Sequence, residues 1–299
     1  MSSTSEIKEQ TNAHKASQPT ASQRARASLW SLRARQTLAV MRLEIKKNFL
    51  SRRAFLLYLI AGLPLVLLSL LTLFPPPSQE QENFSELGTI YATVYGGLIL
   101  RTLVFFGCAW VFMNLFRGEL VDKSLHYYFL APVRREALVI GKYLSGLIAT
   151  VSLFGATTVG SMLILYFRLF PQESARYFSS GAGGGQLLTY LGVTCLACIG
   201  YGAVFLLVGL FFRNPIIPAL MLYGWEWLNF LLPPLLKKLS VIHYLHSLVP
   251  VPLSEGPFAV LAEPTPAWIS VPSVLLFAGV MIFLASLHIR RIEINYGGD

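Results

Sequence analysis

Two charged residues that lie inside long apolar runs are the first candidates for chemistry. Arg101 lies within one such run, and Glu226 lies between Trp225 and Trp227 in another. A charge at the centre of a bilayer costs about 2.5–3.5 kcal/mol on insertion scales, so it usually faces a protein interior or a pathway. Opposite charges at a similar depth would offset that cost, which predicts that Arg101 and Glu226 are neighbours in space. The alternative is that both lie near the outer headgroups, where the tryptophans would form an aromatic belt.

Other side chains that could ligate a metal or attack a substrate are too isolated to form a site. Cys195 and Cys198 share a helix face without a nearby His, Asp or Glu, so small buried residues explain them better than metal ligands do. His243 and His246 lack a third ligand. The chain contains no phosphate loop of the form GxxxxGK[ST] and no hydrolase or metalloprotease motif. We therefore expect no metal site, no catalytic residues and no enzyme activity from this chain by itself.

The elements that must position these residues are predicted to be membrane-spanning helices. The 299-residue chain is 54% hydrophobic and only 13% charged, whereas soluble domains carry about 25% charged residues. A spanning helix needs roughly 20 apolar residues. The sequence predicts an all-α integral membrane protein with six transmembrane helices, at residues 54–74, 90–116, 141–167, 187–212, 215–235 and 268–289.

The distribution of the basic residues predicts the orientation in the membrane. If the N-terminus is inside, 19 of the 24 Lys and Arg residues fall on the inner segments, and Arg101 lies within a span. The outer segments then hold only Arg168, Arg176, Lys237 and Lys238. By the positive-inside rule, both termini are expected in the cytoplasm. The net charge of +9 therefore reflects membrane topology, and we expect no nucleic-acid partner.

Polar and amphipathic segments divide the rest of the chain. Residues 1–28 have almost nothing to bury and are predicted to form a disordered cytoplasmic tail. Residues 29–53 carry apolar side chains at helical spacing with basic side chains on other faces, which predicts an amphipathic helix in the headgroup region. Residues 54–291 would form the six-span domain, and residues 292–299 a cytoplasmic tail.

Two segments on the predicted outer face have different characters. Residues 171–186 include the sequence GAGGG, which is typical of a flexible loop. Residues 233–267 are moderately apolar and interrupted by prolines, so they cannot span the membrane as one helix. Short interfacial or re-entrant helices before the last span are the expected solution.

The segment 117–136 is the main charged interruption between two spans. The predicted topology places it in the cytoplasm, and a short helix can form within it before Pro132. Several of its residues, including Leu125 and Tyr128, are too apolar for a free cytoplasmic loop. Such a surface requires either the membrane or a partner protein.

Taken in order, these features resemble the type-2 permease family of ATP-binding-cassette (ABC) exporters. The resemblance covers about residues 29–291. It is sharpest at Glu119, Ser124-Leu125, Leu130-Ala131-Pro132, Arg134-Arg135 and Gly141-Lys142.

The resemblance implies a permease that works by alternating access or lateral opening, driven by a separate ABC ATP-binding subunit. Residues 117–136 would be the coupling segment, whose cytoplasmic coupling helix docks on that ATPase. The implied contacts are Glu119, Asp122, Lys123, Leu125, His126, Tyr128, Arg134 and Arg135, of which the two arginines would contact either the ATPase or lipid phosphates. The partner would bind ATP and Mg, so no cofactor is expected on this chain. A second permease copy, in a homodimer or heterodimer, membrane lipids and a bacterial cytoplasmic (inner) membrane are also implied.

Two other classes of function stay open at this point. A secondary transporter or channel would use Glu226 as an intramembrane ion or proton site. A membrane-embedded enzyme would need a convergent set of catalytic residues, for which the sequence offers no candidates. Lipids, glycans, antibiotics, peptides and ions are all compatible as cargo.

Overall fold

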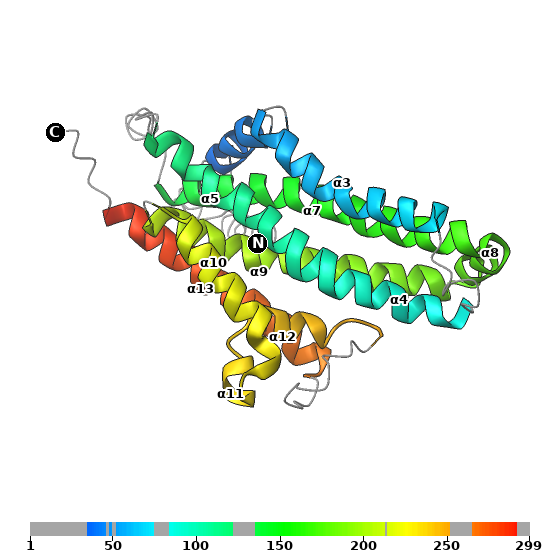
Figure 1. Ribbon diagram of the computed structural model, residues 1–299. Coiled ribbons are helices and arrows are strands. Elements are labelled where there is room, and N and C mark those ends of the chain that lie inside the picture. The colour runs from blue at the N-terminus through cyan, green and yellow to red at the C-terminus, as the bar shows by residue number, and fades with distance from the viewer. Residues whose placement is uncertain are drawn as a thin grey trace, which may run out of the picture.

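A computed structural model shows the chain as a bundle of long helices, with shorter helices gathered beside it (Figure 1). Every regular element among the described residues is a helix. The structure describes residues 35–45, 48–49, 52–74, 84–121, 135–212, 214–251 and 265–291. The predicted terminal tails and most of the segment 117–136 lie outside these ranges.

Within the described residues, five helical runs are long and apolar enough to cross a membrane. They agree with the predicted spans 54–74, 90–116, 141–167, 187–212 and 268–289. Their elements are α3 (Arg52–Leu73), the continuous run of η2 (Phe84–Glu86), α4 (Leu87–Val94), η3 (Tyr95–Val104) and α5 (Phe105–Val121), then α7 (Arg135–Leu169), α9 (Ala182–Phe211) and α13 (Ala267–Arg291). Helices are expected here because hydrocarbon offers the backbone no other hydrogen-bond partner. The predicted all-helical architecture, with several helices long enough to cross a membrane, is thus confirmed for the described residues.

The predicted span at 215–235 is not one continuous helix. It contains α10 (Ile216–Trp227), the 3₁₀ turn η4 (Leu228–Leu231) and the start of α11 (Pro234–Lys237). The 12 residues of α10 reach only about 18 Å at 1.5 Å per residue, whereas the hydrocarbon core is about 30 Å thick. Pro233 cannot continue the helical hydrogen bonding. The count of six spanning helices is therefore not confirmed.

The segment 171–186 is helical, and the expectation of a flexible loop is wrong. α8 (Pro171–Ser179) and the first turn of α9 occupy it. The two helices are joined at Gly181, whose φ of 86° lies in the left-handed region that favours glycine. The glycine run continues into a helix because Gly183 packs against Tyr177 of α8, so closely that a Cβ atom would come 2.8 Å from that ring.

α9 lies at the centre of the bundle, packed against α5, α7 and α13. The crossing with α5 is close, because a Cβ atom on Gly209 would come 2.8 Å from the Cα of Met113. Small residues permit such approaches between helices in membranes. Side-chain hydroxyls add hydrogen bonds across the bundle: the Tyr95 hydroxyl donates to the Tyr190 carbonyl at 3.0 Å. The core therefore combines close backbone packing with buried polar contacts.

The two ends of the bundle differ in what they hold. Helix 35–45 packs at one end, which we call the proximal end, together with the last turns of α5 and the first turns of α7 (Figure 1). α13 also ends there, because Arg135 of α7 donates to the carbonyl of Ile289 at 3.2 Å. α8 lies at the other, distal end (Figure 1). Both helices that flank residues 122–134 thus meet helix 35–45 at the proximal end.

Candidate functional site

The structure describes only two of the predicted coupling residues in part. Glu119 falls in the last turn of α5, and Arg135 is the first residue of α7. The Arg135 side chain contacts the end of α13 through the carbonyl of Ile289. Asp122, Lys123, Leu125, His126, Tyr128 and Arg134 lie outside the described residues. Their contacts with an ATPase stay predictions.

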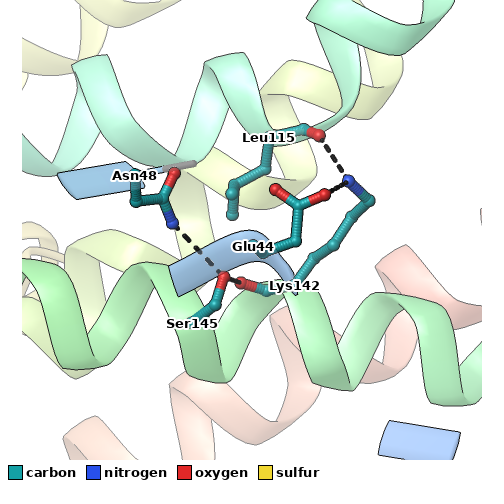
Figure 2. A network of polar contacts seen from close by, with 5 residues as sticks. All are labelled: Glu44, Asn48, Leu115, Lys142 and Ser145. Atoms are coloured by element: carbon teal, nitrogen blue, oxygen red, sulfur yellow. Dashed lines mark hydrogen bonds and ion pairs between the residues drawn. The ribbon is translucent and has the colours of Figure 1, made fainter. Parts of the chain in front are cut away.

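A buried ion pair joins three of the four elements that meet at the proximal end, namely helix 35–45, α5 and α7 (Figure 2). The Lys142 ammonium group of α7 donates to Glu44 Oε1 at 2.7 Å and to the carbonyl of Leu115 in α5 at 3.0 Å. The Lys142 and Glu44 side chains are 0% and 4% exposed. The ammonium group also lies 5.3 Å from the ring centre of Phe116, within range of a cation–π interaction. We call Glu44, Leu115 and Lys142 the proximal node.

Helix 35–45 reaches the node because Gly141 lets it approach α7. A Cβ atom at Gly141 would come 2.9 Å from the Thr37 carbonyl oxygen and 3.0 Å from the Val40 Cβ. Val40 and Glu44, one helical turn apart, are the buried residues of helix 35–45. Beyond it, the Asn48 amide donates to the Ser145 hydroxyl at 3.3 Å (Figure 2). One face of this helix therefore packs on protein.

The opposite side of helix 35–45 carries exposed apolar and basic residues, the two kinds expected at a membrane surface. Leu38 is 44% and Leu43 68% exposed, and Arg42 is exposed beside them. This distribution fits an amphipathic helix with one face in the headgroup region. The predicted interfacial position of residues 29–53 stays a prediction, since it concerns a membrane that the structure does not contain.

The pairing of Glu44 with Lys142 was not predicted from the sequence, although both residues carry a signal. Glu44 is the one acidic residue in the basic segment 29–53, and Lys142 is a charge at the start of a predicted span. A lone negative charge in a basic segment and a positive charge inside an apolar span indicate an ion pair, because pairing offsets the desolvation cost of burying each charge. Lys142 was quoted only as part of a family motif.

Glu226 is buried, with 6% of its surface exposed. Its carboxylate accepts hydrogen bonds from the first residues of α12 (Val241–His246). Its Oε1 accepts from the backbone N–H of Val241 at 3.1 Å. Its Oε2 accepts from the backbone N–H of Ile242 at 3.0 Å, the Ser240 hydroxyl at 2.7 Å and the Tyr201 hydroxyl at 3.3 Å. A carboxylate suits this place, because all four groups donate and two belong to a helix N-terminus.

Arg101 lies beside the same tyrosine but does not pair with Glu226. Both charges interact electrostatically with Tyr201. Among the described residues, however, Arg101 has no hydrogen bond to the Glu226 carboxylate and no ion pair with it. Trp225 and Trp227 are 36% and 50% exposed, which is compatible with contact with lipid.

Residues that could have formed a metal site do not come together. No group of three His, Cys, Asp or Glu side chains could hold a metal ion in the part of the chain that the structure describes. Cys108 and Cys198 are buried, and Cys195 is half-buried in α9. His243 shares a hydrogen bond of 3.2 Å with the Thr265 hydroxyl. These side chains pack between helices.

Comparison with known proteins identifies the family to which this chain belongs. The family model described as "ABC-2 family transporter protein" matches residues 40–223. That range includes Glu44, Arg101 and Lys142, and it ends just before Glu226. No curated protein and no solved structure matches the chain. Because the matched range covers more than half of the chain, the protein belongs to the ABC-2 family of transporter proteins.

Proposed function

We propose that the protein is the permease subunit of an ATP-driven ABC exporter, which moves its cargo with the help of a separate ATP-binding subunit. The observation that carries this proposal is the family match over residues 40–223 in a chain without a phosphate loop of its own. Such a chain must obtain the energy of ATP from another protein. A second permease copy would complete the transporter.

Residues 117–136 are proposed to receive the force from the ATPase. They connect α5 with α7, and Lys142 of α7 donates both to α5 and to helix 35–45. A push on the segment between these helices would therefore reach two spans and helix 35–45 together. The proposed contacts remain the eight residues that the family resemblance implies, from Glu119 to Arg135.

The proposed topology keeps six passages, of which the fifth is broken into short helices. α9 ends at the proximal end, where Gly209 packs on Met113 of α5, and α13 also ends there. The chain between them must therefore travel away from that end before α13 returns. α10, η4, α11 and α12 would make this passage, with α12 beside Gly200 in the middle of α9. Both termini would then lie in the cytoplasm of a bacterial cell.

The alternative of a secondary transporter or channel depends on Glu226. An ion or proton site needs a carboxylate that can change its partners during transport. The Glu226 carboxylate instead accepts four hydrogen bonds, two of them from the first backbone amides of α12. This arrangement supports a structural part for Glu226 and favours the ATP-driven mechanism.

Co-purification tests the proposed function directly. The tagged chain would be extracted in mild detergent from the membranes of its source organism, beside untagged membranes as the control. We expect a protein with a phosphate loop to elute with the tagged chain and to hydrolyse ATP. A chain that purifies without an ATPase, and whose transport follows a proton gradient without ATP, would overturn the proposal.

A further inference from the structure

Arg101 stands in the middle of the second spanning run. The run Phe84–Phe116 has 33 residues, so roughly 25 Å of helix separates Arg101 from either end at about 1.5 Å per residue. Apart from Glu86 near its start, Arg101 is the one charged residue of this run. If this run is centred in the membrane, the guanidinium group lies about 15 Å from either headgroup region. It therefore needs a partner within the membrane.

No protein group supplies that partner among the described residues. The Arg101 Nε atom is enclosed and makes no hydrogen bond, while part of the side chain stays accessible. Its one interaction in the described structure is electrostatic, with Tyr201. An ionisable residue left in this state inside a membrane usually marks a ligand or a pathway.

Among the described residues, no carboxylate neutralises Arg101. Glu226 is already occupied by its four donors. The five spanning runs contain two other acidic residues, Glu86 and Glu136, and both stand near the ends of their helices. A second copy of the chain would bring the same set of carboxylates. The described residues therefore leave Arg101 without a counter-charge, which a bound anionic molecule would supply.

The helix around Arg101 leaves room for such a molecule. Residues Tyr95–Val104 form a π-helix, a rare conformation that is frequent at functional sites. The Thr102 hydroxyl closes this turn by donating to the Gly97 carbonyl at 3.1 Å. Gly97 is exposed, and a Cβ atom there would meet nothing within 4 Å. The space one turn before Arg101 is thus open at the surface of the bundle.

Aromatic side chains border this space on the side of α10. The Tyr223 hydroxyl lies 3.4 Å from the Thr102 hydroxyl, and the rings of Tyr223 and Phe106 are 4.7 Å apart. Such rings offer apolar surface next to a polar group. A ligand that fits here combines an anionic group with an apolar body.

We propose that Arg101 binds the anionic group, a carboxylate or a phosphate, of an amphiphile at mid-membrane depth. The apolar part of the amphiphile lies against the surface formed by Gly97, Phe106 and Tyr223. As a statement about cargo, this inference rests on the proposed function, because it names the substrate class of the exporter. As a statement about binding, it needs only the permease.

Binding can be measured on the full chain in nanodiscs of phosphatidylcholine, without the ATPase. The probe is the fluorescent cis-parinaric acid, and its methyl ester is the neutral match. We expect the acid to bind the natural protein at least tenfold more tightly than the ester does. Arg101→Gln should reduce the affinity for the acid to that for the ester. Arg101→Lys should retain part of the difference, and Arg168→Gln, at an exposed helix end, should retain all of it.

Thermal stability separates a ligand site from a structural role. Because Arg101 has no protein partner to lose, Arg101→Gln should unfold at the same temperature as the natural protein or higher. Equal binding of acid and ester to the natural protein would overturn the proposal. So would acid binding that survives Arg101→Gln, or a fall in the unfolding temperature of Arg101→Gln that Arg101→Lys restores.

The source of the amphiphile is resolved by adding phosphatidylglycerol to the nanodiscs. Competition between this lipid and parinaric acid, lost in Arg101→Gln, identifies a membrane lipid as the ligand. Binding of the acid without competition identifies an amphiphile distinct from the bulk lipid. Both results support an anionic ligand at Arg101. Because no ATPase takes part, a failure here is distinguishable from a failure of the co-purification experiment.

Discussion

At the scale of single residues, Lys142 shows how a permease can keep a charge inside a packed helix bundle. A buried ammonium group is tolerated when a carboxylate and further hydrogen bonds replace its water. Glu44 supplies the carboxylate at 2.7 Å and Leu115 supplies a carbonyl at 3.0 Å. Apolar residues could hold the same helices together without this desolvation cost. We therefore interpret the pair as a device that fixes one arrangement of helix 35–45 on α5 and α7.

Removing one charge of the pair should cost much more than removing both. We expect Lys142→Met to lower the free energy of unfolding by about 3–5 kcal/mol, because it leaves the Glu44 carboxylate buried without its partner. The double change Glu44→Leu with Lys142→Met should restore most of that loss. Reversible unfolding in mixed micelles measures both values.

The matched control for the pair is Arg168→Met, which removes an exposed charge from the other end of α7. Its effect should stay within about 0.5 kcal/mol, as for most surface substitutions. A double variant that is as unstable as Lys142→Met would contradict the idea that the two charges act as one unit.

Glu226 should behave as a structural acceptor. Glu226→Gln replaces one acceptor oxygen with an NH₂ donor, which then faces groups that also donate. We expect a loss of about 1–3 kcal/mol in the free energy of unfolding. Faster hydrogen exchange at the Val241 and Ile242 amides should accompany this loss, and mass spectrometry measures it. If Glu226 were instead a proton site, the substitution would abolish proton-driven transport and leave those amides protected.

Sequence patterns predicted some of these residues and missed others for a physical reason. Hydropathy singled out Arg101 and Glu226, because each charge stands inside an apolar run. The partners of Glu226 did not follow from the sequence, since Ser240, Val241 and Ile242 come from a separate segment beyond Pro233. The pairing of Glu44 with Lys142 likewise joins residues 98 positions apart. Which buried charges meet is decided by tertiary packing.

At the scale of elements, the close crossing of helix 35–45 over α7 depends on glycine at position 141, which has no side chain. Gly141→Ala would place a Cβ atom 2.9 Å from the Thr37 carbonyl oxygen. Helix 35–45 must then move by a few tenths of an ångström, which would lengthen the Glu44–Lys142 contact. We expect Gly141→Val, with its larger side chain, to detach helix 35–45 and expose Glu44.

Limited proteolysis of the chain between helix 35–45 and α3 measures this detachment. Gly141→Val should be cleaved there at least several times faster than the natural protein. Gly279→Ala is the matched control, because a Cβ atom at Gly279 would meet nothing within 4 Å. It should leave the cleavage rate unchanged and, as alanine favours helix, cost no stability. Equal cleavage of the two variants would contradict the close crossing at Gly141.

Five spans were predictable within a few residues because apolar length alone determines a helix in a membrane. The segment 215–235 has the same composition, but Pro233 and Pro234 divide it and Glu226 folds α12 back onto it. The segment 171–186 was wrongly predicted as a loop from its glycines. There, packing of Gly183 on Tyr177 of α8 overrides the low helix propensity of glycine.

At the scale of the whole molecule, the proximal end is where we propose that the ATPase docks. The ends of α5, α7 and α13 meet there with helix 35–45, joined by the proximal node and by the contact between Arg135 and Ile289. The proposed coupling segment 117–136 connects two of these helices. Arg101 lies far from this end, in the middle of the bundle. Force from the ATPase would thus enter at the proximal end and act on cargo bound at Arg101, in the middle of the bundle.

We propose that an ATPase drives this permease through residues 117–136. The most direct test measures ATP hydrolysis by the purified complex in proteoliposomes, with the natural chain, with Glu119→Lys and with Leu125→Asp. Glu173→Lys, a matched charge reversal in α8 at the distal end, is the control. We predict that Glu119→Lys and Leu125→Asp insert normally but lose the ATPase and its activity, whereas Glu173→Lys keeps both. Equal ATP hydrolysis by all four complexes would contradict the claim.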